Sequence, residues 1–179
     1  GRRIYDNIRK AMEYILVIHI PIALSALAAP LLALPVLLAP IHVVLLELII
    51  DPTCSIIFER QPEERDIMER PPRPVDAPIV TRGLLGKALA QGLAIFAAAF
   101  GSYYLTLPHG GPEHARTFFL TVLVLSNLFL VYVNRSDKDF AFAAGCAAID
   151  KTAWFVNIGV LLCLIVMSTL PQAAAATKL

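Results

Sequence analysis

Five apolar stretches, each close to the length of a membrane-spanning helix, constrain the fold of this chain more than any other feature. A transmembrane helix needs about 20 mostly apolar residues, and such stretches lie at about 11–33, 37–57, 84–106, 116–134 and 153–170. Hydrophobic residues make up 58% of the 179 and charged residues 16%, whereas a soluble domain carries about 25% charged residues. We therefore predict an all-α, polytopic membrane helical bundle with about five transmembrane helices, and not a soluble helical protein.

Positive charge is concentrated on one side of these predicted helices. Of the 15 Lys and Arg residues, only Arg116 and Lys178 fall outside the segments 1–10, 58–87 and 135–151. Loops rich in Lys and Arg stay in the cytoplasm, so we predict a cytoplasmic N-terminus and a cytoplasmic loop at 58–82. The net charge of +1 gives no reason to expect a nucleic-acid partner.

The second apolar stretch contains two carboxylates and a proline. Glu47 and Asp51 are four residues apart, so on a helix they share one face. Pro52 has no N–H, so the carbonyl of Leu48, one turn earlier, loses its helical partner. Ionisable residues at membrane depth are functional candidates, and two acids beside a freed carbonyl predict a cation site. The alternatives are acids that reach the membrane surface, or carboxylates that stay protonated.

His19 in the first stretch is a further candidate ligand. Pro21 follows two residues later and releases the carbonyl of Val17, which permits a kink near the same depth. If His19 lies beside Glu47 and Asp51, its imidazole favours transition-metal binding or proton coupling. The alternative is a buried neutral imidazole that hydrogen-bonds to a neighbouring helix.

Two segments resemble P-type cation-transporting ATPases. Gly1-Arg2-Arg3-Ile4-Tyr5-Asp6-Asn7-Ile8 resembles the junction between the phosphorylation domain and the fifth transmembrane helix. Residues 66–73 read Asp-Ile-Met-Glu-Arg-Pro-Pro-Arg and resemble the loop between the sixth and seventh helices of type II pumps. The whole chain, 1–179, thus resembles the C-terminal transmembrane domain of a pump of the bacterial calcium-pump-like group. The resemblance implies a domain-coupling loop that includes Asp66, Met68, Arg70, Pro71, Pro72 and Arg73.

The resemblance also implies roles for four side chains. Asp51 matches an aspartate that ligates the cation in calcium pumps, and Glu47 and His19 occupy positions where those pumps have coordinating asparagines. Asn127 occupies the position of a glutamate ligand. Because the acids are redistributed in this way, the transported ion stays open between Ca²⁺ or another divalent cation, a monovalent cation, and a site coupled to proton counter-transport.

The resemblance therefore implies the membrane half of an ATP-driven cation pump in the bacterial plasma membrane. ATP and Mg²⁺ would belong to the whole pump, and the partners would be lipid and the pump's N-terminal helices and cytoplasmic domains. This chain alone would not hydrolyse ATP: Asp150-Lys151-Thr152 begins like the phosphorylation motif, but Ala153-Trp154 follows. The alternative is a free-standing membrane pore or interaction subunit, and faces left open in a truncated bundle would favour a homodimer.

Overall fold

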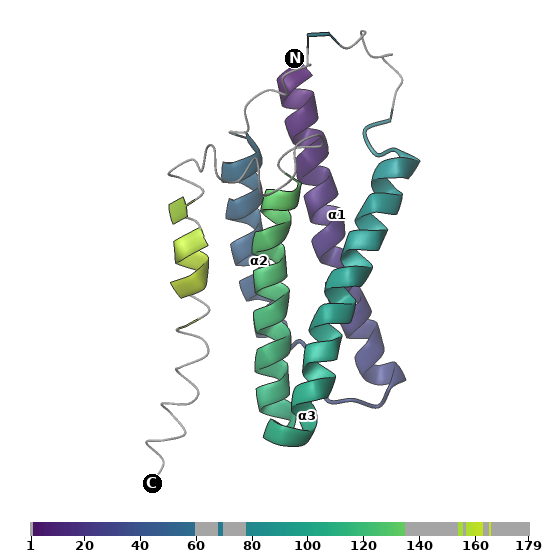
Figure 1. Ribbon diagram of the computed structural model, residues 1–179, viewed down its shortest axis with the longest axis vertical. Coiled ribbons are helices and arrows are strands. Elements are labelled where there is room, and N and C mark those ends of the chain that lie inside the picture. Colours follow the sequence, from purple (N-terminus) through teal and green to yellow (C-terminus); the bar gives the residue numbers. More distant parts are fainter. Residues whose placement is uncertain are drawn as a thin grey trace.

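The computed structural model consists of helices packed along one another (Figure 1). It describes residues 2–59, 68–69, 78–134, 154–155, 157–162 and 165, and for residues 49–55 it describes the backbone only. Within these residues the elements are α1 (Arg2–Leu31), α2 (Pro40–Thr53), the π-helix η1 (Cys54–Phe58) and α3 (Arg82–Val133), and there is no strand. The all-α fold class expected from the sequence is confirmed.

α1 begins earlier and ends slightly earlier than the first predicted span. The helix has 30 residues and includes the charged segment that precedes the span. At its end Ala33 adopts a left-handed conformation with φ of 51°, and the N–H of Leu34 donates to the carbonyl of Ala29 at 2.9 Å. This pattern is a Schellman motif, which satisfies carbonyls at a helix end. Pro35 follows directly and prevents the helix from continuing.

α2 and η1 together occupy most of the second predicted span. α2 starts at Pro40, where a residue without an N–H costs no helical hydrogen bond. The predicted bend at Pro52 falls in the last turn of α2, and the backbone then continues as the five-residue π-helix η1. Single-turn π segments commonly occur near functional sites.

α3 consists of two arms that meet at a sharp kink, and these arms carry the third and fourth predicted spans. The first arm begins after Thr81, whose hydroxyl accepts from the N–H of Leu84 at 3.3 Å as an N-cap. At the kink Gly111 has φ of 74° and ψ of 178°, a conformation that favours glycine. Pro112 comes next and disfavours the α conformation in the residue before it.

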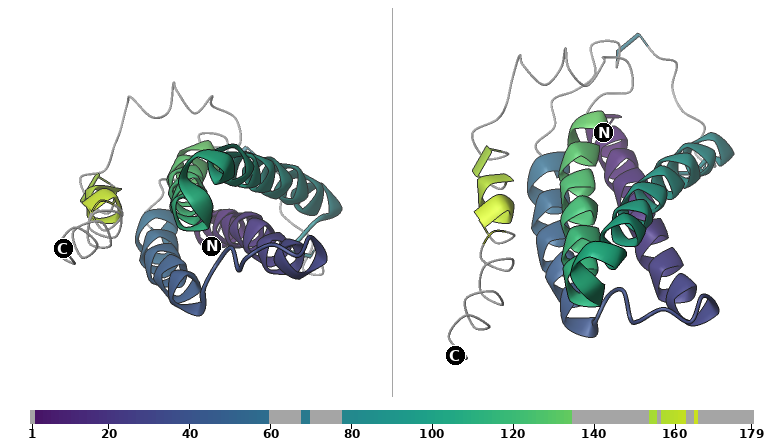
Figure 2. Two further views of the ribbon diagram at one scale, coloured as in Figure 1. Left: turned by 90° about the horizontal axis from the view of Figure 1, so that it is seen from below. Right: turned by 60° about the horizontal axis from the view of Figure 1, so that its bottom comes forward.

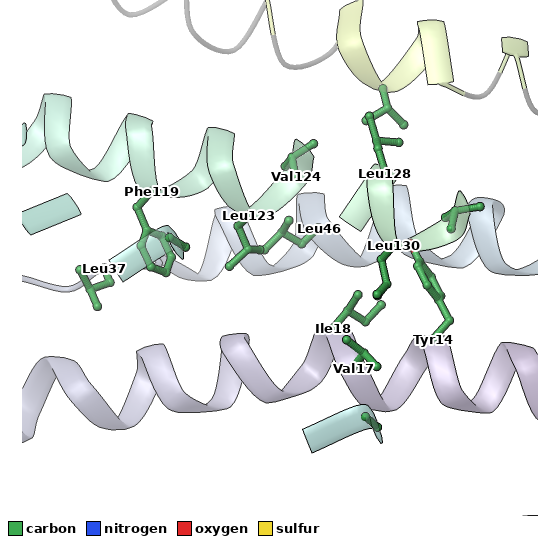
Figure 3. Packing of buried hydrophobic residues seen from close by; sticks show 14 of the residues in the cluster. Tyr14, Val17, Ile18, Leu37, Leu46, Phe119, Leu123, Val124, Leu128 and Leu130 are labelled. Carbon is green, nitrogen blue, oxygen red and sulfur yellow. The ribbon is translucent and has the colours of Figure 1, made fainter. Parts of the chain in front are cut away.

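Both arms of α3 face α1, and the second arm also lies beside α2 (Figures 1, 2 and 3). The first arm crosses α1, and the second arm lies beside α2 in all the views (Figures 1 and 2). The approach of α1 to the first arm is close: a Cβ added to Gly92 would lie 2.7 Å from the Cβ of Ile20. The absence of a side chain at Gly92 therefore allows the two backbones to come together.

The apolar core joins α1, α2 and the second arm of α3. Figure 3 shows Leu123 of α3 directed towards Leu46 of α2, and Leu130 of α3 directed towards Ile18 of α1. These four side chains are at most 4% exposed. Where α1 meets η1, the ring of Tyr14 packs against that of Phe58, with centroids 5.3 Å apart.

Two of the described helices, α1 and α3, are long and apolar enough to cross a membrane. α2 has only 14 residues. Large apolar side chains also cover the outside of the bundle, including Leu85, Leu89 and Leu93 on successive turns of α3. Such a surface suits contact with lipid, where no aqueous penalty applies to exposed apolar groups.

Candidate cation site

His19 of α1 and Glu47 of α2 lie side by side between the two helices. Nε2 of His19 is 3.4 Å from Oε1 of Glu47. Neither side chain is buried, because 48% of the His19 side chain and 40% of the Glu47 side chain are exposed. The two candidate ligands that the sequence placed in separate apolar stretches thus meet in the structure.

The second nitrogen of His19 limits what can lie between this pair. Nδ1 of His19 is 2.8 Å from the carbonyl oxygen of Ile15, one turn earlier on α1. A carbonyl oxygen can only accept a hydrogen bond, so Nδ1 must carry a proton. In neutral His19 the lone pair of Nε2 then faces a carboxylate oxygen, and two acceptors attract each other only through a proton or a cation.

Asn127 lies on the buried face of the second arm of α3. It follows Leu123 by one turn and precedes Leu130 by one turn, and these two residues face α2 and α1 respectively. Asn127 is 3% exposed, and its Oδ1 atom has no hydrogen-bond partner among the described residues. A buried amide oxygen without a partner is energetically costly, and it is also a suitable cation ligand.

The backbone around Asp51 is α-helical through Thr53 and then continues as the π-helix η1. Asp51 is in the last turn of α2, four residues after Glu47 and directly before Pro52. The structure describes the backbone of Asp51 and not its side chain. Pro21 is buried within α1, two residues after His19, and its carbonyl accepts a hydrogen bond from the hydroxyl of Ser25.

The predicted coupling loop contacts the start of α1. Nη1 of Arg2 donates to the carbonyl of Met68 at 3.5 Å, and Nδ2 of Asn7 donates to the carbonyl of Glu59 at 3.3 Å. The loop residues Asp66, Arg70, Pro71, Pro72 and Arg73 lie outside the described residues.

Metal-binding side chains do not gather into a larger cluster in the part of the chain whose side chains are described. No group of three or more His, Cys, Asp and Glu residues that could hold a metal ion is found there. The described candidate ligands are therefore the His19–Glu47 pair and Asn127. A complete coordination shell would need ligands from elsewhere, because metal ions in proteins take four or more ligands.

The ion pair between Glu13 and Lys87 was not predicted from the sequence. Glu13 of α1 forms an ion pair with Lys87 of α3, with 2.8 Å between Oε1 and Nζ. The Glu13 side chain is only 5% exposed. A carboxylate one turn into an apolar helix signals a partner elsewhere, but only the packing of α1 on α3 identifies Lys87 as that partner.

Comparison with known proteins assigns the family. The model of the family described as "Cation transporting ATPase, C-terminus" matches residues 35–179. The chain is 34% identical to a calcium-transporting ATPase of Bacillus subtilis over 140 residues, which are 76% of this chain and 16% of that protein. It is 25% identical to the probable cation-transporting ATPase F of Mycobacterium tuberculosis over 155 residues, 86% of this chain and 16% of that protein.

A third relative is named for the transport of other ions. The chain is 33% identical to the sodium/potassium-transporting ATPase subunit alpha of Drosophila melanogaster over 113 residues, 62% of this chain and 11% of that protein. The chain thus spans about one sixth or less of the length of these relatives. The family match and the apolar helices α1 and α3 make it an integral membrane protein, and the chain belongs to the P-type cation-transporting ATPases, as part of their C-terminal membrane region.

Proposed function

We propose that this chain supplies part of the cation-binding site of an ATP-driven pump. The ligands would be Glu47 and Asp51 from α2, His19 from α1 and Asn127 from α3. The observation that carries the proposal is the contact of His19 with Glu47, in which Nε2 and Oε1 are 3.4 Å apart. A cation shared by these two atoms, or a transported proton on one of them, would hold the pair together.

The partial exposure of the pair supports a site that is completed by other helices. About half of each side chain is open in this chain, although both lie far from the ends of their apolar stretches. In the family the fourth helix supplies further ligands, so the open side of the pair would face the N-terminal part of the pump. Discontinuous helices near the bilayer centre are a common way to build transport sites, and Pro52 followed by η1 fits that pattern.

The charged start of α1 suggests how the site would communicate with the cytoplasm. α1 extends through Arg2 well beyond its apolar part, and the loop after η1 contacts this extension through Arg2 and Asn7. Movement of a phosphorylation domain at this end would be transmitted along α1 to His19. ATP and Mg²⁺ would be bound by the cytoplasmic domains of the complete pump.

We further propose a bacterial plasma membrane as the location, with the N-terminus in the cytoplasm. The support is the concentration of Lys and Arg on one side of the predicted spans and the bacterial origin of several relatives. Ca²⁺ or another divalent cation is the proposed cargo, because carboxylate and amide oxygens are hard ligands.

The test uses the complete pump in lipid and a panel of Ca²⁺, Mg²⁺, Mn²⁺, Zn²⁺, Na⁺, K⁺ and pH values. We expect one ion to stimulate ATP hydrolysis, and Glu47→Gln to abolish or strongly weaken that stimulation. Glu113→Gln is the matched control, because Glu113 is an exposed acid beside the α3 kink. Equal stimulation in Glu47→Gln and in the unmodified pump would contradict the proposed site.

A further inference from the structure

The buried ion pair between Glu13 and Lys87 is a second charged contact of α1. It joins α1 to α3, whereas the His19–Glu47 contact of the candidate site joins α1 to α2. Lys87 is in the second turn of α3. Its Nζ is 2.8 Å from Oε1 of Glu13, which is 5% exposed, whereas the Lys87 side chain is 41% exposed. A carboxylate so fully buried needs its partner, because an unpaired buried charge is strongly destabilising.

The pair and the close approach at Gly92 together fix the rotation of α1. Glu13 and Ile20 are seven residues apart, which is close to two helical turns, so they lie on the same face of α1. Both contact the first arm of α3, Glu13 through Lys87 and Ile20 at Gly92. Two contacts on one face hold a helix against rotation about its axis.

This rotation determines where His19 points. His19 directly precedes Ile20, so its side chain is turned about 100° away from the α3 contact. In the structure that direction brings Nε2 of His19 to Glu47 of α2. A small rotation of α1 would therefore move His19 relative to Glu47.

We propose that Glu13 and Lys87 are positioning residues, which hold α1 against α3 and so set the position of His19 relative to Glu47. The effect on the cation site rests on the function proposed above. The ion pair itself does not, because its contribution to stability can be measured independently.

The test compares Lys87→Met, Lys87→Arg and the double variant Glu13→Gln/Lys87→Met in the complete pump. For each we would measure the cation concentration for half-maximal phosphorylation, the maximal ATPase rate and the thermal stability. We expect Lys87→Met to raise the half-maximal cation concentration about tenfold, an effect within the range seen for residues that influence a site without touching its ligand. Lys87→Arg retains the ion pair and should behave like the unmodified pump.

The double variant distinguishes positioning from simple charge compensation. It leaves no buried unpaired charge, so we expect it to regain thermal stability while its half-maximal cation concentration stays raised. Recovery of both quantities in the double variant would overturn the positioning role, as would an unchanged cation concentration in Lys87→Met. Arg82→Met is the control, since Arg82 is an exposed cation in the first turn of the same helix.

Glu47→Gln, measured in parallel, separates this inference from the proposed function. An unchanged half-maximal concentration in Glu47→Gln would contradict the cation site itself. A raised value in Glu47→Gln without one in Lys87→Met would contradict the positioning role alone.

Discussion

The two charged contacts of α1 differ in the way expected of a binding site and a structural contact. On the α3 side, Glu13 meets Lys87 at 2.8 Å and is almost completely buried. On the α2 side, His19 meets Glu47 at 3.4 Å, and both side chains are about half exposed. The first pair brings complementary charges to within 2.8 Å, whereas the second is open and needs a proton or cation to become attractive.

A charged residue in a membrane helix can therefore serve either helix packing or ligand binding, and its partner distinguishes the two roles. The cost of placing a charge at membrane depth is offset at Glu13 by a partner within the protein. At Glu47 that cost remains partly unmet within the described residues, and a bound cation would offset it. Substitutions in and beside each pair test this difference.

The largest effect is expected at Asp51, the acid one turn after Glu47. Asp51→Asn removes a charged ligand and should lower cation-stimulated phosphorylation by about 100-fold or more, the scale of losing one partner from a charged contact. Phosphorylation of the complete pump at a fixed cation concentration measures this, with Glu113→Gln as the control. An equal loss in both variants would mean that removing any acid has this effect.

Lys87→Met should have the next largest effect, and it should affect stability. The change leaves the Glu13 carboxylate buried without its partner. Breaking a fully buried pair costs about 3–5 kcal/mol, and because Lys87 is 41% exposed we expect about 2–3 kcal/mol. Thermal unfolding in detergent measures the loss, and an unaltered melting temperature would remove the distinction between the two pairs.

Gly92→Ala tests the close approach that accompanies the buried pair. The new Cβ would lie 2.7 Å from Cβ of Ile20, so the helices must separate, at a cost of about 1–2 kcal/mol as for other overpacked cores. Gly101→Ala is the matched control on the same arm, because nothing lies within 4 Å of its added Cβ. It should be neutral or slightly stabilising, and similar melting temperatures for the two variants would contradict the close contact.

The smallest effect is expected from His19→Gln. If Nε2 of His19 binds the cation, replacing the imidazole removes one ligand atom from the site. We expect the half-maximal cation concentration of the variant to rise about threefold, the scale of one lost polar contact. His109→Gln is the control, because His109 makes the same contact with a carbonyl four residues earlier. Equal half-maximal cation concentrations in all three proteins would remove His19 from the site.

Local residue chemistry made much of the fold predictable. The Schellman turn before Pro35, the start of α2 at Pro40 and the kink at Gly111-Pro112 all follow from residues with restricted or unusual backbone preferences. The continuation of α1 to Arg2 was not predicted, because the predicted span was defined by apolar residues, and charged residues can either continue a helix or precede it. Here Asn7 contacts Glu59, and Arg2 contacts Met68.

The candidate site was predictable in its residue types and not in its pairings. Spacing places Glu47 and Asp51 on one face of a helix, and resemblance pointed to His19. Neither the spacing nor the resemblance shows that Nδ1 of His19 hydrogen-bonds to the carbonyl of Ile15, which turns Nε2 towards Glu47. In the same way, nothing in the sequence near Glu13 names Lys87, because their contact depends on how α1 crosses α3.

The most direct test of the account is equilibrium cation binding to the purified complete pump in the absence of ATP. The stimulating cation would be titrated into the unmodified protein, into Glu47→Gln, which alters the exposed His19–Glu47 pair, and into Lys87→Arg, which retains the buried Glu13–Lys87 pair. We expect Glu47→Gln to lose binding and Lys87→Arg to keep it. Undiminished binding by Glu47→Gln would contradict the central claim that the His19–Glu47 pair is part of the cation site.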